Sequence, residues 1–247
     1  MSKKYKNPPI VEALCEVQFV PGQPWDYTVH GLFYEKISKE FPEKQQQMGI
    51  GIKLSQVSGT IQHEVLPAPD KMQFISQDKA ALVQVGTDLL VVNRLKPYNG
   101  WEHFKPLIQN NLNKFMEVAK PKDFKRIGLK YINKIDIPGQ TFRLQDYFNY
   151  YPLIPKELPQ THGPFNARVE FLYENLRDRL LLTIGTFVAE APNTVSILLD
   201  LDYVMNTPEK LPLNMFDSWL ENAHSAIEKT FEACLTGKCK DLFEEMK

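Results

Sequence analysis

The strongest constraint on the fold is an order of predicted elements that recurs in the two halves of the 247-residue chain. Residues 1–121 predict a strand, a helix, four strands and a long helix. Residues 122–247 predict a strand, a short helix, three strands and a long helix. Strand hairpins followed by an amphipathic helix favour α+β layers, with the long helices on one face of an antiparallel sheet. We therefore expect a tandem duplication with a period of about 115 residues, whose repeats pack as one continuous unit.

The first strand shows its pattern most clearly. Between Val11 and Phe19 the odd-numbered residues are apolar, whereas Glu12, Glu16 and Gln18 stand at even positions. Side chains alternate between the two faces of a strand, so this pattern predicts a half-buried strand with one polar face.

Hydrophobic periodicity and turn residues place the other elements. In the first half they predict a helix over 26–40, strands over 52–65, 72–76, 80–85 and 89–95 with turns at 67–70, 77–79 and 86–88, and a helix over 101–119. In the second half they predict a strand over 124–137, a short helix over 144–150, a loop over 151–164, strands over 165–173, 179–187 and 194–204, and a helix over 214–234.

A saddle of the kind formed by the TATA-binding protein matches this element order best. Ferredoxin-like duplicates, as in RNA-processing proteins, are the alternative fold. No part of the sequence alternates strand and helix after a glycine-rich first turn, which argues against a dinucleotide-binding fold. The fold analogy does not by itself assign a function.

The charge balance argues against a broad nucleic-acid-binding face. The chain has 29 Lys and Arg against 30 Asp and Glu, a formal net charge of −1, whereas such faces usually carry excess positive charge. Cys15, Cys234 and Cys239 suit buried thiols in a reducing compartment better than a disulfide framework. The sequence shows neither a signal peptide nor a membrane span, so we expect a cytoplasmic protein without membrane contact.

Few residues combine into a pattern that carries chemistry. The sequence has no P-loop, HExxH helix, GxSxG elbow or kinase loop, and its five histidines are scattered. Asp200 and Asp202 are two apart on a strand, about 7 Å from each other, and could hold a divalent cation if a third ligand came from elsewhere. The alternative is a solvated strand face. We therefore predict no catalytic residue and no cofactor.

The polar faces of the first strand in each half offer the better candidate site. Arg126, Lys130 and Lys134 line the polar face of the strand over 124–137. If a pseudo-twofold axis places the two first strands side by side, Glu12 and Glu16 face Arg126 and Lys130. Such pairs could simply set the strand register, because each contributes at most about 1 kcal/mol. The alternative is a polar surface that binds a ligand or partner, with three further residues nearby: Asn133, Arg168 and Arg179.

Three segments resemble a sporadically distributed family of uncharacterised bacterial and archaeal proteins. The segment Asn7-Pro8-Pro9-Ile10-Val11-Glu12, followed by Glu16 and Phe19, is similar to the N-terminal signature of that family. The segment Arg126-Ile127-Gly128-Leu129-Lys130-Tyr131-Ile132-Asn133 resembles its central strand, and residues 231–243 resemble its C-terminal helix and tail. Gln18 stands where the family pattern has arginine. The patchy distribution implies mobile or defence-associated prokaryotic genes and a role that depends on a partner.

These observations lead to three hypotheses for function. The first is a non-enzymatic binding or adaptor protein that presents its polar sheet face to a protein partner or to nucleic acid. The second is a metal-dependent nuclease or hydrolase that uses Asp200, Asp202 and a strand glutamate. The third is a sensor of a small anionic ligand, bound by Arg126, Lys130 and Arg168. Edge strands of an open sheet could also support a homodimer.

Overall fold

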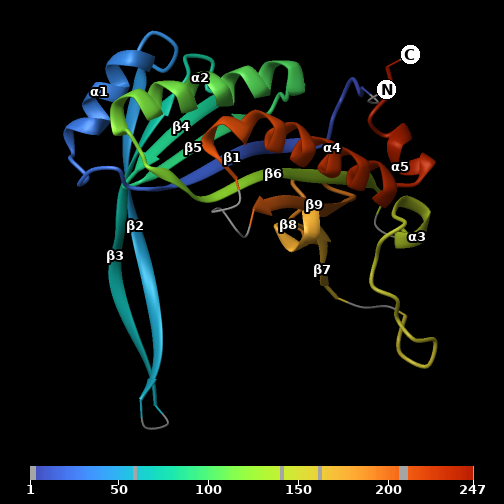
Figure 1. The fold of residues 1–247 in the computed structure, drawn as a ribbon. Helices are drawn as coiled ribbons and strands as arrows, with labels where there is room; N and C mark the ends of the chain where they lie inside the picture. The colour runs from blue at the N-terminus through green and yellow to red at the C-terminus, as the bar shows by residue number, and fades with distance from the viewer. Residues whose placement is uncertain (1–3, 58–59, 140–141, 161–162, 206–210, 247) are drawn as a thin grey trace.

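One open antiparallel sheet of nine strands organises the chain, in the order β2-β3-β4-β5-β1-β6-β9-β8-β7 (Figure 1). The computed structural model describes residues 4–246 apart from 58–59, 140–141, 161–162 and 206–210, and it describes no side chains for 47–70 and 175. The strands are β1 (Ile10–Val20), β2 (Glu43–Val57), β3 (Thr60–Ile75), β4 (Ala81–Gly86), β5 (Leu89–Leu95), β6 (Asp123–Pro138), β7 (Asn166–Tyr173), β8 (Asp178–Phe187) and β9 (Thr194–Met205).

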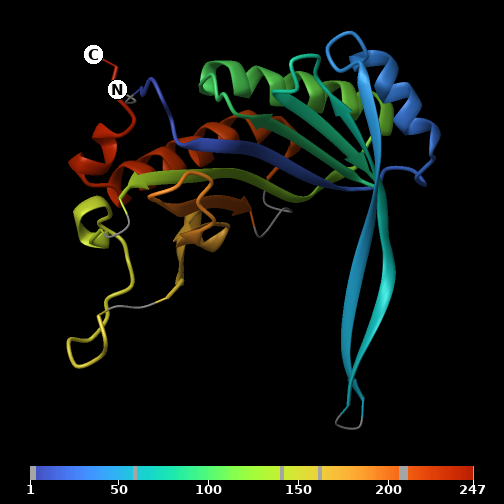
Figure 2. The same ribbon diagram turned by 180° about the vertical axis from the view of Figure 1, so that it is seen from behind.

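The two long helices lie along one face of this sheet (Figures 1 and 2). The α-helices are α1 (Thr28–Ile37), α2 (Trp101–Ala119), α3 (Leu144–Tyr147), α4 (Phe216–Cys234) and α5 (Gly237–Asp241), and the 3-10 helices are η1 (Glu174–Leu176) and η3 (Leu213–Met215). The expected α+β class with long helices on one face of an antiparallel sheet is therefore confirmed.

The two first strands, β1 and β6, lie side by side at the centre of the sheet. They pair antiparallel, so that Cys15 stands opposite Leu129 and Glu16 opposite Gly128. Odd-numbered residues of both strands point toward the helices and form the middle of the core. They are Ala13, Cys15, Val17, Phe19, Ile127, Leu129, Tyr131, Ile135 and Ile137, all at most 4% exposed. The alternation in the sequence thus predicts which face is buried.

The hairpin of β2 and β3 differs from the prediction. The sequence indicates a turn at 67–70, but these residues belong to β3, and β2 and β3 join at 58–59, outside the described residues. Pro67 and Ala68 pair with Ile50 and Gly49 of β2, whereas β4 pairs with β3 only from Met72 onward. The prolines are tolerated because this part of β3 has a neighbouring strand on one side only. A proline, which has no N–H to donate, can therefore face the free edge.

Three helices are shorter than predicted. The helix expected over 26–40 covers Thr28–Ile37, although the Asp26 carboxylate accepts a hydrogen bond from the Thr28 amide at 2.8 Å. The short helix expected over 144–150 covers Leu144–Tyr147. The helix expected over 214–234 starts at Phe216, after the turn of η3.

The three cysteines are free and buried. Burial raises the pKa of the Cys234 thiol to about 11 and that of the Cys239 thiol to about 12. Burial also raises the pKa of the Cys15 thiol. All three thiols are therefore protonated at neutral pH and pack as apolar side chains.

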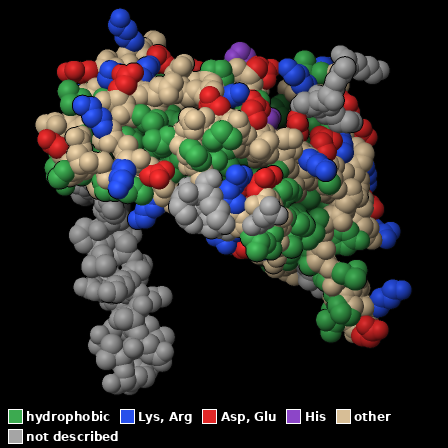
Figure 3. All heavy atoms as spheres, viewed as in Figure 1, with side chains coloured by type: hydrophobic (Ala, Val, Ile, Leu, Met, Phe, Trp, Pro, Cys, Tyr) green, Lys and Arg blue, Asp and Glu red, His purple; other side chains and the backbone are tan. Residues whose placement is uncertain are grey.

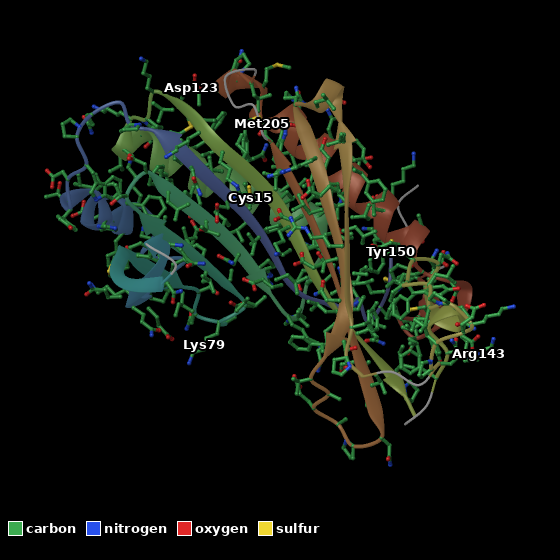
Figure 4. The ribbon with its side chains drawn as sticks, turned by 90° about the horizontal axis from the view of Figure 1, so that it is seen from below. Cys15, Lys79, Asp123, Arg143, Tyr150 and Met205 are labelled. Atoms are coloured by element: carbon green, nitrogen blue, oxygen red, sulfur yellow. The ribbon has the colours of Figure 1, made fainter. Side chains whose placement is uncertain are left out.

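The face of β1 and β6 that lies away from the helices is not covered by any described helix (Figure 4). In Figures 1 and 2 the β2–β3 hairpin projects on this side at one end of the sheet, and the segment that follows α3 projects on the same side at the other end. The uncovered face thus lies between two projecting segments.

A close approach after β1 requires glycine at position 22. A Cβ atom at Gly22 would lie 2.2 Å from the carbonyl oxygen of Lys120 at the end of α2. We expect Gly22→Ala to lower the free energy of unfolding by about 1–3 kcal/mol, because the backbone must shift. In Gly31→Ala the new Cβ meets nothing within 4 Å on α1, and we expect an increase of up to about 1 kcal/mol. Denaturant unfolding measures both, and equal stability of the two variants would contradict the close contact.

Candidate functional site

The central strands place six charged side chains on the uncovered face of the sheet. We call this group the polar floor; its members are Glu12 and Glu16 of β1, Arg126 and Lys130 of β6, and Asp200 and Asp202 of β9. They stand at even positions, so their side chains point away from the buried side chains at the odd positions of the same strands. The side chains of Glu16, Arg126, Lys130 and Asp200 are between 20% and 35% exposed, so they are partly shielded but accessible.

An ion pair between Glu16 and Arg126 spans the seam between β1 and β6. Arg126 Nη1 donates to Glu16 Oε1 at 2.5 Å, and Gln18 Nε2 donates to the same oxygen at 2.9 Å. Gln18 stands directly opposite Arg126, and Glu16 stands opposite Gly128, so the pair is diagonal. A Cβ atom at Gly128 would lie 3.5 Å from Arg126 Nη1, so the guanidinium lies close to this glycine. The predicted contact between Glu16 and Arg126 is confirmed.

Lys130 takes a different partner from the one predicted. Its ammonium nitrogen lies 2.8 Å from Asp200 Oδ2, on the neighbouring strand β9 rather than on β1. Asp202 stands directly opposite Lys130. Burial raises the pKa of the Asp202 carboxyl, against the opposing effect of the positive charges on Lys130 and Arg126. Each cation of the seam thus lies next to a carboxylate, Arg126 next to Glu16 of β1 and Lys130 next to Asp200 of β9.

Glu12 is held by a chain of amide side chains instead of a cation. Asn93 Nδ2 donates to Glu12 Oε1 at 2.6 Å, and Gln84 Nε2 donates to Asn93 Oδ1 at 3.1 Å. Gln73 Nε2 then donates to Gln84 Oε1 at 3.4 Å. This chain crosses β1, β5, β4 and β3 on the uncovered face. The sequence contains a signal for it, because Gln84 is the single polar residue of β4 and Asn93 directly follows the apolar run at the start of β5.

Two predicted members of the site lie elsewhere. Asn133 stands at an odd position of β6, is 1% exposed and donates to the carbonyl oxygen of Leu199 at 3.0 Å. It lines a cavity on the helix side of the sheet. Arg168 lies on the edge strand β7, which β9 and β8 separate from β6. At about 4.8 Å per strand this places its backbone about 14 Å from β6.

The remaining cations near the floor also have acidic partners. Lys134 Nζ lies 3.0 Å from Glu190 and 3.6 Å from Asp136. The guanidinium groups of Arg168 and Arg179 both contact Glu170, at 3.3 Å and 3.4 Å. Two cations and four carboxylates in the polar floor give it a formal charge of 2 − 4 = −2. Each cation that the sequence assigned to this face is therefore compensated.

Asp200 and Asp202 lie on the predicted face, but Asp200 already forms an ion pair with Lys130. Asp200 and Asp202 share the uncovered face of β9, and the Lys130 ammonium occupies the side of Asp200 that faces β6. The strand glutamates proposed as third ligands are engaged by Asn93 and Arg126. The described part of the chain brings no group of three His, Cys, Asp or Glu residues into a geometry that could hold a metal ion.

Comparison with known proteins finds no matching protein-family model and no similar curated protein. Within the described residues, no helix has the length and apolar character needed to cross a membrane.

The Lys130–Asp200 pair tests how strongly the floor depends on its compensated charges. Lys130→Met removes the cation beside the Asp200 carboxylate. The other oxygen of that carboxylate, Oδ1, is buried without a hydrogen-bond partner. We expect the free energy of unfolding to fall by about 2–4 kcal/mol, because a shielded charge loses its partner. The double variant Lys130→Met, Asp200→Asn should recover most of this loss.

Arg168→Met is the matched control for this prediction. Its ion pair with Glu170 joins side chains that are 53% and 41% exposed, and water screens such pairs. The change in stability should stay within about 0.5 kcal/mol. Chemical denaturation of the three variants decides the point, and a loss in Lys130→Met no larger than in Arg168→Met would show that the pair is not structurally important.

Proposed function

We propose that the chain is a non-enzymatic binding protein that presents the polar floor to a protein partner. The observation that carries the proposal is the pairing of both cations of the floor with carboxylates: Arg126 contacts Glu16 and Lys130 contacts Asp200. Paired cations and carboxylates at fixed positions offer directed hydrogen bonds, which suits protein recognition.

Apolar side chains between the charges support the same proposal. On β1, Leu14 stands between Glu12 and Glu16, and on β6, Ile132 stands next to Lys130 on the same face. Both apolar side chains are partly exposed. Protein interfaces mix apolar and polar contacts in this way.

The arrangement of strands supports a duplicated saddle as the fold. From the centre outward, β1 is followed by β5, β4, β3 and β2, and β6 by β9, β8 and β7. The first strand of each half is central and the last strand of each half is its neighbour, as in the saddle of the TATA-binding protein. We propose that residues 1–121 and 122–247 are the two repeats, and that the second has one strand fewer.

The other hypotheses have weaker support. Nucleic-acid binding requires cations that are available to phosphates, and the cations of this face contact carboxylates. The same pairing argues against a site for a small anion. A second argument is distance, because Arg168 lies on the edge strand β7, far from Lys130 on β6. A metal-dependent hydrolase would need the Lys130 ammonium to leave Asp200.

The biological setting is part of the proposal. The free, buried cysteines support a reducing, cytoplasmic location. The resemblance of the N-terminal and central motifs to a patchily distributed prokaryotic family supports a link to a mobile or defence-associated system. A homodimer through β7 is a further proposal, because this edge strand has one neighbour and exposes Phe171 and Leu172. Hydrophobic side chains gather at this end of the sheet in Figure 3.

A charge-swap variant tests the proposal without removing the ion pair. Glu16→Arg together with Arg126→Glu keeps opposite charges at the seam but reverses their positions. We expect a folded protein whose thermal midpoint stays within a few degrees, since the pair can re-form. The tagged variant should lose a stoichiometric protein partner that the tagged wild-type chain retains after nuclease treatment, as measured by affinity purification and mass spectrometry.

The matched control exchanges Arg168 and Glu170, an exposed pair on β7. This variant should retain the partner, because its charges lie outside the polar floor. Retention of the partner by the Glu16 and Arg126 swap would contradict the proposal. Enrichment of nucleic acid that depends on Arg126 would favour the nucleic-acid alternative instead.

A further inference from the structure

A cavity of about 370 Å³ lies on the helix side of the sheet, opposite to the polar floor. Tyr131 and Asn133 of β6 form part of its base, and α4 contributes His224 and Glu228 to its wall. The start of α2 and the segment over 4–10 complete the lining. Because the walls come from both halves of the chain, the cavity exists only where β1 and β6 join them.

Aromatic rings form much of the wall. The Trp101 indole stacks on the His224 imidazole, with ring centroids 4.0 Å apart and planes at 12°. Tyr98 packs edge-on against Tyr131 at 5.6 Å and 78°. Tyr5 from the N-terminal segment lines the outer side. Rings of this kind attract cations through the negative potential over their faces.

The buried polar groups of the cavity are uncharged at neutral pH. The Tyr98 hydroxyl lies 2.8 Å from the Tyr131 hydroxyl, which in turn lies 3.3 Å from His224 Nδ1. Burial raises the pKa of both tyrosines and lowers the pKa of His224. The phenols and the imidazole therefore fix the rings in place without adding charge.

The ionised groups of the lining are predominantly acidic. Three glutamates and two lysines line the cavity, a formal charge of 2 − 3 = −1. Lys4 lies 2.7 Å from Glu102, and two lining residues pair with residues outside the cavity: Lys6 with Glu244 at 3.1 Å and Glu232 with Lys240 at 2.8 Å. The negative charge of Glu228 acts on the interior: it adds to the effect of burial on the pKa of Tyr98 and Tyr131, and it opposes the lowering of the pKa of His224 by burial.

The two ends of the chain close the outer side. The Lys6 amide donates to the carbonyl oxygen of Glu244 at 3.0 Å, and the Met246 amide donates to that of Lys4 at 2.8 Å. Tyr5 contacts Phe243 edge-on at 5.7 Å and donates to Glu232 at 2.7 Å. In Figure 1 the described segment before β1 and the one after α5 lie together near the end of α4. This closure favours a small molecule over a macromolecular ligand.

We propose that this cavity binds a small organic ammonium ion, with the cationic centre between the aromatic rings of Tyr98 and Trp101 and the carboxylate of Glu228. The volume is in the range of small-molecule sites, and aromatic faces beside a carboxylate match the charge and the apolar substituents of such an ion. The site is independent of the polar floor, which lies on the other face of the sheet.

Isothermal titration of the full chain with choline is the direct test. Choline should bind saturably, whereas 3,3-dimethyl-1-butanol, which has the same shape without the charge, should bind at least about tenfold more weakly. Equal affinity for the two compounds, or no saturable choline binding up to about 10 mM, would overturn the proposal. Phosphatidylcholine vesicles should not bind, and binding to vesicles would overturn the assignment to a small molecule.

Two variants locate the site within the chain. Glu228→Gln removes the charge at nearly constant size and should weaken choline binding about tenfold. Trp101→Leu removes an aromatic face and should weaken it to a similar degree. Glu117→Gln on the exposed side of α2, where the side chain is 63% exposed, is the control and should bind as the wild type does.

Unchanged affinity in both folded cavity variants would overturn the assignment of the site. The exchange of Glu16 and Arg126 on the polar floor should leave choline binding unchanged. Failure of the cavity proposal is therefore distinguishable from failure of the proposed partner binding. Thermal denaturation without ligand confirms that each variant is folded.

Discussion

The antiparallel pairing of β1 with β6 is the interaction on which the rest of the structure depends. It joins the two halves of the chain into one sheet, with Glu16 opposite Gly128 and Cys15 opposite Leu129. Because side chains alternate along a strand, the same pairing builds two different surfaces. Its even-numbered residues form the polar floor, and its odd-numbered residues form the core and the base of the aromatic cavity.

Charge compensation on the floor connects its stability with its proposed function. Lys130 and Arg126 both lie next to carboxylates that are partly shielded from water. Such pairs contribute little net stability compared with apolar residues, but breaking one leaves a charge without a partner. They fix the positions of hydrogen-bonding groups across the seam. A protein partner can use these fixed positions, whereas phosphates would have to displace the carboxylates.

The sequence predicted local features well and the details of pairing less well. Alternation from Val11 to Phe19 identified the buried face of β1, because burial depends on the strand period alone. The partners of Glu12 and Lys130 depend on the strand register and on neighbouring strands, which the period does not specify. Asn133 was assigned by its polar type, although its odd position indicated the helix side. The cavity combines residues from distant parts of the sequence, and no local pattern marks it.

The central claim is that β1 and β6 join both halves into one cooperative unit, and native-state hydrogen exchange tests it most directly. We expect the paired amides of β1 and β6 to exchange only through global unfolding, with the same free energy as the inner strands β5 and β9. The measurement would show one shared value across the seam that matches the free energy of unfolding from denaturant. Exchange of one half at a much lower free energy, while the other half stays protected, would contradict the account.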